Sequence, residues 1–162
     1  MIPLSRLSTR KITQLTFKPQ NMKSSKNETA VFLELSGYLT GFSEMELLGT
    51  GMLETYYDVA KNNNSIGVFE SFLGKAAEIM RNKNDVEKIN NAIGSELMPV
   101  FLFNGLAQNI ITMWYMGNWT NGTVISPQSY IQGLIWTVAD AHPPGAKQPG
   151  YGSWSKDPTK KL

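Results

Sequence analysis

Apolar side chains recur at the spacing of an α-helix in several consecutive runs, and each run is bounded by a capping or turn signal. Strict alternation of apolar and polar residues, which a half-buried strand requires, is not sustained anywhere, and no internal repeat is found. A chain of 162 residues is of the length of one domain. The sequence therefore predicts an all-α fold, a single domain of about five to six helices.

Two helices are expected in the first third of the helical region. The first covers 28–40, opens after Asn27 as N-cap and ends at Gly41. Ser43 and Glu46 form a capping box that opens the second helix. The apolar side chains assigned to their inner faces are Val31, Phe32, Leu35, Tyr38 and Leu39 for the first, and Met45, Leu48, Met52, Leu53, Tyr56 and Val59 for the second. The polar run 62–65 is expected to end the second helix.

Four more helical segments are expected further along the chain. A third run presents Phe69, Phe72, Leu73, Ala76 and Met80. A short helix over 85–93 starts from Asn84 and presents Val86, Ile89 and Ile93. A long apolar helix runs from Glu96 to Met116 with Pro99 in its first turn, and Ser126-Pro127 opens a last helix with Tyr130, Ile131, Leu134, Ile135 and Val138 on one face.

The segment 98–117 has about the 20 residues that a membrane-spanning helix needs. Asn104, Gln108 and Asn109 fall near its centre, where amides without partners are costly in hydrocarbon. The sequence therefore favours a buried or interface helix over a membrane span. Docking of 98–116 on a membrane surface is kept as an alternative.

The composition and pattern of the sequence predict three regions: a flexible arm over 1–26, a helical domain over 27–139 and an extended tail over 140–162. The tail is rich in proline and glycine, so it is expected to be neither helix nor strand. It also carries Tyr151 and Trp154, which is unusual for a purely disordered tail. We interpret it as a segment that lies across a partner with its aromatic side chains as anchors.

Composition excludes most common active-site chemistries. The chain has no cysteine, which excludes thiolate sites, and one histidine, His142, whereas most metal and triad chemistries need at least one well-placed histidine. No metal and no cofactor is expected in this chain. The net charge of +2 gives no reason to expect a nucleic-acid partner. A free-standing helical enzyme that uses His142 and Asp140 is kept as an alternative.

Large aromatic residues gather in the last third of the chain, which is typical of a protein-binding surface. The residues expected to contact a partner are Trp114, Tyr115, Trp119, Trp136, His142, Pro144, Tyr151 and Trp154.

Three sequence blocks resemble the small subunits of membrane-bound FAD-dependent sugar and polyol dehydrogenases, the family named for sorbitol dehydrogenase. Phe32-Leu-Glu-Leu-Ser-Gly-Tyr-Leu-Thr-Gly-Phe42 resembles its Leu-Ser-x-x-Leu-Thr-Gly-Phe opening, and Trp114-Tyr-Met-Gly117 is similar to its Trp-Tyr-x-Gly step. Tyr130-Ile-Gln-Gly-Leu-Ile-Trp136, followed by Pro143-Pro-Gly145, Pro149-Gly-Tyr-Gly-Ser-Trp154 and Pro158, is similar to its C-terminal signature.

The resemblance implies an accessory, chaperone-like role. In such complexes a large glucose–methanol–choline-type subunit holds the FAD and oxidises the alcohol, and a cytochrome c subunit often takes the electrons. The small subunit helps the large one to mature, and contacts the membrane only through the complex. Members usually carry a twin-arginine signal and a tail cysteine. Here no apolar segment follows Ser8-Thr-Arg-Lys11 and cysteine is absent. The resemblance thus implies that the chain lies on the periplasmic side of the inner membrane, whereas the sequence as written favours the cytoplasm. Without a cysteine, the complex is expected to be held non-covalently.

Overall fold

The computed structural model describes residues 21–82 and 85–146, and these residues are mostly helical, which confirms the all-α prediction. The elements in chain order are α1 (Asn21–Thr40), α2 (Glu44–Gly49), α3 (Leu53–Asn62), α4 (Ile66–Asn82), α5 (Val86–Ala92), a π-helical turn (Ile93–Leu97), α6 (Phe101–Met116), β1 (Asn118–Trp119), a 3₁₀ turn (Thr120–Gly122), β2 (Thr123–Val124), α7 (Pro127–Ile131) and α8 (Leu134–Val138). Residues 1–20 of the arm expected over 1–26, and residues 147–162 of the tail expected over 140–162, lie outside the described residues.

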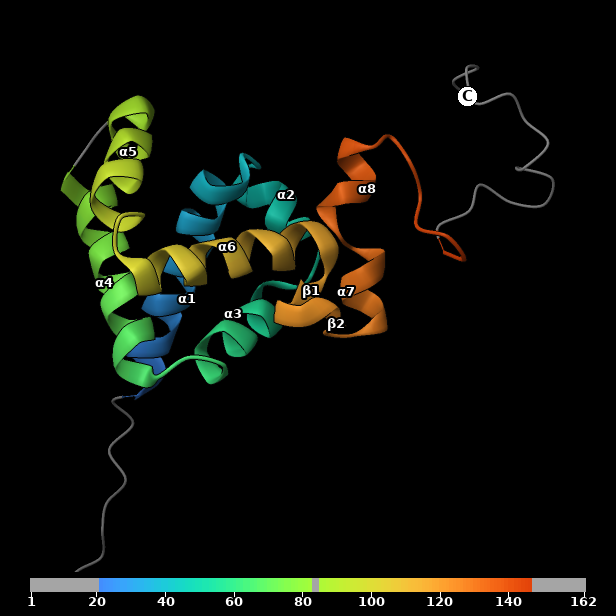
Figure 1. The fold of residues 1–162 in the computed structure, drawn as a ribbon, viewed down its shortest axis with the longest axis horizontal. Coiled ribbons are helices and arrows are strands. Elements are labelled where there is room, and N and C mark those ends of the chain that lie inside the picture. Colours follow the sequence, from blue (N-terminus) through green and yellow to red (C-terminus); the bar gives the residue numbers. More distant parts are fainter. Residues whose placement is uncertain (1–20, 83–84, 147–162) are drawn as a thin grey trace, which may run out of the picture.

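Helix α6 is central to the packing, because it contacts α1, α3, α4 and α8. Figure 1 shows α4 and α5 at one end of the molecule and α7 and α8 at the other, with α6 running between them. The inner face of α6 is buried through Leu106, Ala107, Ile110, Met113 and Trp114. Full burial of a large apolar side chain contributes roughly 1.5–3 kcal/mol, so this one helix carries a large part of the core. No helix in the described ranges is both long and apolar enough to cross a membrane.

Helix α1 begins at Asn21, so the prediction that Asn27 caps it is wrong and the helix crosses the expected domain boundary at 26/27. Once a helix has nucleated, each further residue adds one backbone hydrogen bond, and no proline or glycine stops it in 21–26. Its predicted end is confirmed, because Gly41 has φ +78°.

The second predicted helix is two helices in the structure. The Ser43–Glu46 capping box is present and opens α2, as predicted. The chain then turns at Gly51, which has φ +69°, before α3 begins. This break changes which face is buried: Met45 is 78% exposed, and Leu47, which was not on the predicted stripe, is fully buried.

The polar run after α3 ends that helix by the mechanism expected. The side-chain amides of Asn63 and Asn64 donate hydrogen bonds to the carbonyls of Val59 and Ala60, at 2.8 and 2.7 Å. Helix α4 follows. The five apolar residues predicted for its inner face, Phe69, Phe72, Leu73, Ala76 and Met80, are all buried.

The connection from α5 to α6 differs from the prediction in three respects. Asp85, not Asn84, caps α5, and its side chain accepts a hydrogen bond from the Glu87 N–H at 2.9 Å. Val86 is exposed although it was assigned to the inner face. Pro99 lies in the turn before α6 instead of inside its first turn, because the proline ring would clash with the preceding helical carbonyls if the helix of 93–97 continued.

The α7–α8 end is also divided where the sequence predicted one helix. The Ser126-Pro127 start is confirmed, with Ser126 and Ser129 exchanging hydrogen bonds. Helix α7 then stops and α8 restarts at Leu134. The reason is a close approach at Gly133: a Cβ there would lie 2.7 Å from the Tyr115 carbonyl oxygen at the end of α6. As a result Val138 points to solvent rather than to the core.

Gly117 is expected to be the least replaceable glycine at this end. Gly117 and Gly122 have similar positive φ values, +69° and +74°, but only Gly117 faces another backbone: a Cβ there would lie 2.4 Å from Ser129. Gly122→Ala should therefore cost about 1–2 kcal/mol, the left-handed penalty alone. Gly117→Ala should cost at least about 2 kcal/mol more, because the backbones must also separate. Urea unfolding of both variants measures this, and equal losses would contradict the close approach.

Candidate functional site

Trp114 has a core role in the structure, which corrects its prediction as a partner-binding residue. Its side chain is completely buried, and its ring packs edge-on against Tyr56 with the ring centroids 4.8 Å apart. Burial strongly raises the pKa of Tyr56. The helical period of α6 places Trp114 on the same face as Ile110 and Met113, so the stripe in the sequence already contained this outcome.

Tyr115 and Trp119 are both half-buried at the junction of α6 with the rest of the chain. The Tyr115 hydroxyl donates a hydrogen bond to the carbonyl of Thr40 at 2.9 Å, and its ring meets Phe42 edge-on. Trp119 lies on β1 and packs against the core. Part of each side chain is therefore used to hold the chain together, and only the remainder faces solvent.

Trp136 lies on α8, and His142 lies in the segment that follows this helix. The Trp136 indole N–H donates a hydrogen bond to the Tyr130 carbonyl at 2.8 Å, and its ring packs edge-on against Tyr130. Both Trp136 and His142 are half-buried and line the same groove, while Pro144 is exposed. Tyr151 and Trp154 lie outside the described residues.

This groove, which we call the α2–α8 groove, lies between α2, the α7–α8 segment and residues 141–143, and has a volume of about 340 Å³. Its lining is mixed: Phe42, Ile131, Leu134 and Trp136 supply apolar surface, and Glu46 and His142 supply polar groups. Asp140, the residue paired with His142 in the enzyme alternative, is exposed and has φ +50°. A groove with apolar walls and a few polar groups is typical of a binding site.

Glu46 contributes a negative charge to the rim of the groove. Its Oε2 accepts hydrogen bonds from the Ser43 hydroxyl at 2.7 Å and from the Ser43 backbone N–H at 2.8 Å. These bonds, the hydroxyl first, hold the pKa of the Glu46 carboxyl below its usual value. The carboxylate is therefore ionised at neutral pH, and α2 holds a second acid, Glu44, and no basic residue.

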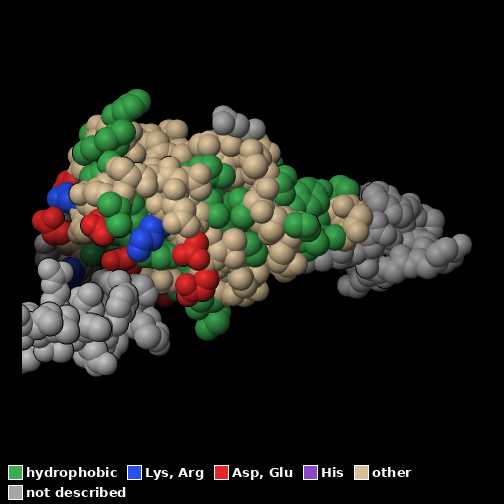
Figure 2. All heavy atoms as spheres, turned by 90° about the horizontal axis from the view of Figure 1, so that it is seen from below, with side chains coloured by type: hydrophobic (Ala, Val, Ile, Leu, Met, Phe, Trp, Pro, Cys, Tyr) green, Lys and Arg blue, Asp and Glu red, His purple; other side chains and the backbone are tan. Residues whose placement is uncertain are grey.

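A long stretch of the chain has no charged residues, a feature that the sequence interpretation missed. No Asp, Glu, Lys or Arg lies between Glu96 and Asp140, a stretch that forms α6, the β1–β2 hairpin, α7 and α8. We call the exposed side chains of 97–139 the charge-free surface. Its exposed large apolar residues are Val100, Phe101, Leu102, Met116, Val124 and Val138. Figure 2 shows hydrophobic side chains gathered beside the point where the C-terminal residues leave, with charged ones toward the other end of that face.

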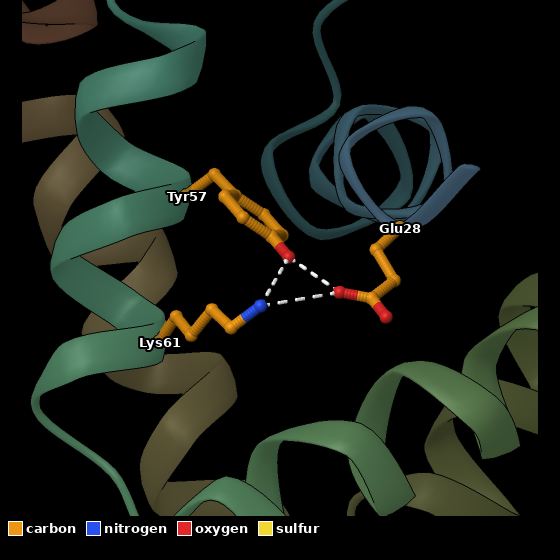
Figure 3. Close-up of polar contacts among 3 residues, drawn as sticks. All are labelled: Glu28, Tyr57 and Lys61. Carbon is orange, nitrogen blue, oxygen red and sulfur yellow. Dashed lines mark hydrogen bonds and ion pairs between the residues drawn. The ribbon is translucent and has the colours of Figure 1, made fainter. Parts of the chain in front are cut away.

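A separate polar cluster joins α1 to α3 (Figure 3). The Tyr57 hydroxyl donates to the Glu28 carboxylate at 2.6 Å, and the Lys61 ammonium lies 3.1 Å from that hydroxyl and 3.4 Å from the carboxylate. Burial, followed by the bond to Glu28, raises the pKa of Tyr57, so the phenol stays protonated and keeps donating. Tyr57 is almost fully buried, and its ring packs edge-on against Phe32 and Phe69. This arrangement holds helices together.

Among the residues that the structure describes, no group of three His, Cys, Asp or Glu side chains is placed to hold a metal ion. Comparison with known proteins finds no family model that matches the chain, and no curated protein or solved structure that is significantly similar to it. The candidate functional site is thus the α2–α8 groove, and the charge-free surface is a second candidate contact region.

The Glu46 carboxylate is expected to make α2 sensitive to acid. Because the pKa of Glu46 is lowered in the folded chain, its stabilising effect is present above the unfolded pKa of about 4.3 and is lost as pH falls through the folded pKa. Glu46→Gln should therefore be less stable than the unchanged chain at pH 7, and the difference should be smaller at about pH 3. Urea midpoints at both pH values measure the difference, and a constant difference would contradict the assignment.

Proposed function

We propose that the chain is a non-catalytic small subunit that binds, stabilises and helps to mature the FAD-containing catalytic subunit of a sugar or polyol dehydrogenase complex. The observation that carries the binding role is the charge-free surface, with its exposed apolar side chains on α6, β2 and α8. The similarity of the three sequence blocks to the dehydrogenase small subunits supplies the kind of partner. The described residues offer no competing metal centre.

A partner explains why these side chains remain at the surface. The other helices carry charged residues on their exposed sides, such as Glu54 and Asp58 on α3 or Glu78 and Arg81 on α4. The buried centres of protein interfaces are depleted in charge and enriched in aromatic residues and methionine. Covering apolar surface contributes about 25 cal/mol per Å², so a partner seated here would stabilise both chains.

The catalytic chemistry would belong entirely to the partner. The large glucose–methanol–choline-type subunit would hold FAD and oxidise the sugar, and a cytochrome c subunit would take the electrons. This chain would contribute the half-buried Trp119 and Trp136 and the exposed side chains of the charge-free surface, while Tyr151 and Trp154 would extend the contact. The complex would be held without a disulfide, because this chain has no cysteine.

Recovery of a flavoprotein with the tagged chain from its native host tests the proposal. We expect a roughly equimolar second protein with a flavin absorbance spectrum and alcohol-dependent dye reduction. Val138→Lys should reduce its recovery at least about tenfold, because the new charge would be desolvated in the interface. Val86→Lys is the matched control, since Val86 on α5 is equally exposed (63% against 59%) but lies outside the charge-free surface.

Two outcomes would overturn the proposal. Purification of the unchanged chain without any flavoprotein would remove the dehydrogenase partner. Equal losses from Val138→Lys and Val86→Lys would show that the charge-free surface is not the contact.

Peripheral membrane binding is the second candidate function, and one observation favours it. The apolar residues Val100, Phe101 and Leu102 lie together at the start of α6, and Phe101 is 87% exposed. Such side chains can enter the headgroup region of a bilayer. In that case the purified chain should co-sediment with phosphatidylcholine vesicles, and Phe101→Ser should abolish this; no sedimentation of the unchanged chain would exclude the candidate.

A further inference from the structure

The α2–α8 groove lies directly beside the point where the described chain ends. Ala141, His142 and Pro143 form one of its walls, and Ala146 is the last described residue. We propose that residues 147–162 fold back over this groove in the free chain and place the aromatic side chains of Tyr151 and Trp154 against it. The groove would then be the internal binding site of the C-terminal segment, a role that does not depend on the proposed dehydrogenase partner.

The length of chain after Ala146 permits this return. At 3.3–3.6 Å per extended residue, Tyr151 can lie up to about 18 Å from Ala146 and Trp154 up to about 29 Å. The groove starts three residues before Ala146, so only a short reversal is needed. Pro149-Gly150 supplies the residues that a type II turn prefers at its two central positions. Closing so short a loop costs little entropy.

The chemistry of the groove suits this segment in two ways. Its apolar walls, Phe42, Leu134 and Trp136, can receive aromatic rings, and a volume of about 340 Å³ leaves space for a large side chain. Its rim carries the negative charge of Glu46, whose carboxylate is ionised. The segment is basic: it contains Lys147, Lys156, Lys160 and Lys161 against the single acid Asp157. Opposite charges would therefore orient the segment over α2.

Disulfide trapping in the full chain tests the proposal without background, because the chain has no cysteine. Thr137→Cys places a thiol at the groove and Gly152→Cys places one between the two aromatic residues. The control pair combines Gly152→Cys with Lys88→Cys, an exposed position on α5 at the far end of the molecule. We expect intrachain disulfide formation at least about tenfold faster in the first pair, because docking raises the local thiol concentration.

Replacing both aromatic residues, Tyr151→Ala with Trp154→Ala, should lower the rate of the first pair to that of the control. Equal rates in the two cysteine pairs would overturn the proposal. Disulfide-linked dimers in place of the intrachain product would also overturn it, since the segment would then occupy the groove of a second copy.

A second readout uses His142, which lines the groove and is the only histidine in the chain. Its ring protons therefore give unambiguous NMR signals. Aromatic rings that dock nearby change the chemical shifts of these protons. The double variant Tyr151→Ala, Trp154→Ala, made without the added cysteines, should therefore show different His142 chemical shifts from the unchanged chain. The fold itself should be unchanged, as judged by circular dichroism. Unchanged His142 signals in this variant would show that the aromatic residues do not enter the groove.

Discussion

The close backbone contact between Gly117 and Ser129 determines where the α7–α8 end of the molecule lies. The Gly117 carbonyl accepts hydrogen bonds from the Ser129 hydroxyl at 2.8 Å and from the Ile125 N–H at 3.0 Å. A side chain at Gly117 would occupy the space that these bonds require. Gly133 makes a second close approach, to the carbonyl of Tyr115. Together these contacts place α7 and α8 against the end of α6, and the α2–α8 groove exists because of that placement.

The molecule combines a conventional helical body with one unusual end. In the body, charged residues are exposed and the helices are held by buried apolar faces and by contacts such as the Glu28–Tyr57–Lys61 cluster. At the α7–α8 end, backbone approach and the hydroxyl of Ser129 replace charge as the means of attachment. A surface that needs no ion pairs for its own folding can stay uncharged, and this makes it suited to contact with another apolar surface.

Several features that depend on interactions within a few residues were predicted correctly from the sequence, whereas several that depend on contacts with distant segments were not. The Ser43–Glu46 capping box, the Ser126-Pro127 helix start and the helix break at 62–65 were predicted correctly, because each depends on side chains bonding to backbone within four residues. The inner face of α2 and the burial of Val86 and Val138 were predicted wrongly. A short helix after a glycine turn takes its orientation from what it packs against, and that partner is distant in the sequence.

The candidate site shows the same division. The gap in charge between Glu96 and Asp140 is a property of the sequence alone, and so is the basic, aromatic character of 147–162. Aromatic composition by itself could not separate Trp114, which is entirely in the core, from Trp136, which lines a groove. The sequence determined the helical class, the caps and the uncharged stretch over 97–139, because these depend on residue type and local spacing. Only the tertiary structure decided that Glu46, Trp136 and His142 share one groove. The backbone contacts of Gly117 and Gly133 place α7 and α8 against the end of α6, and Tyr115 in that end contacts Phe42 just before α2.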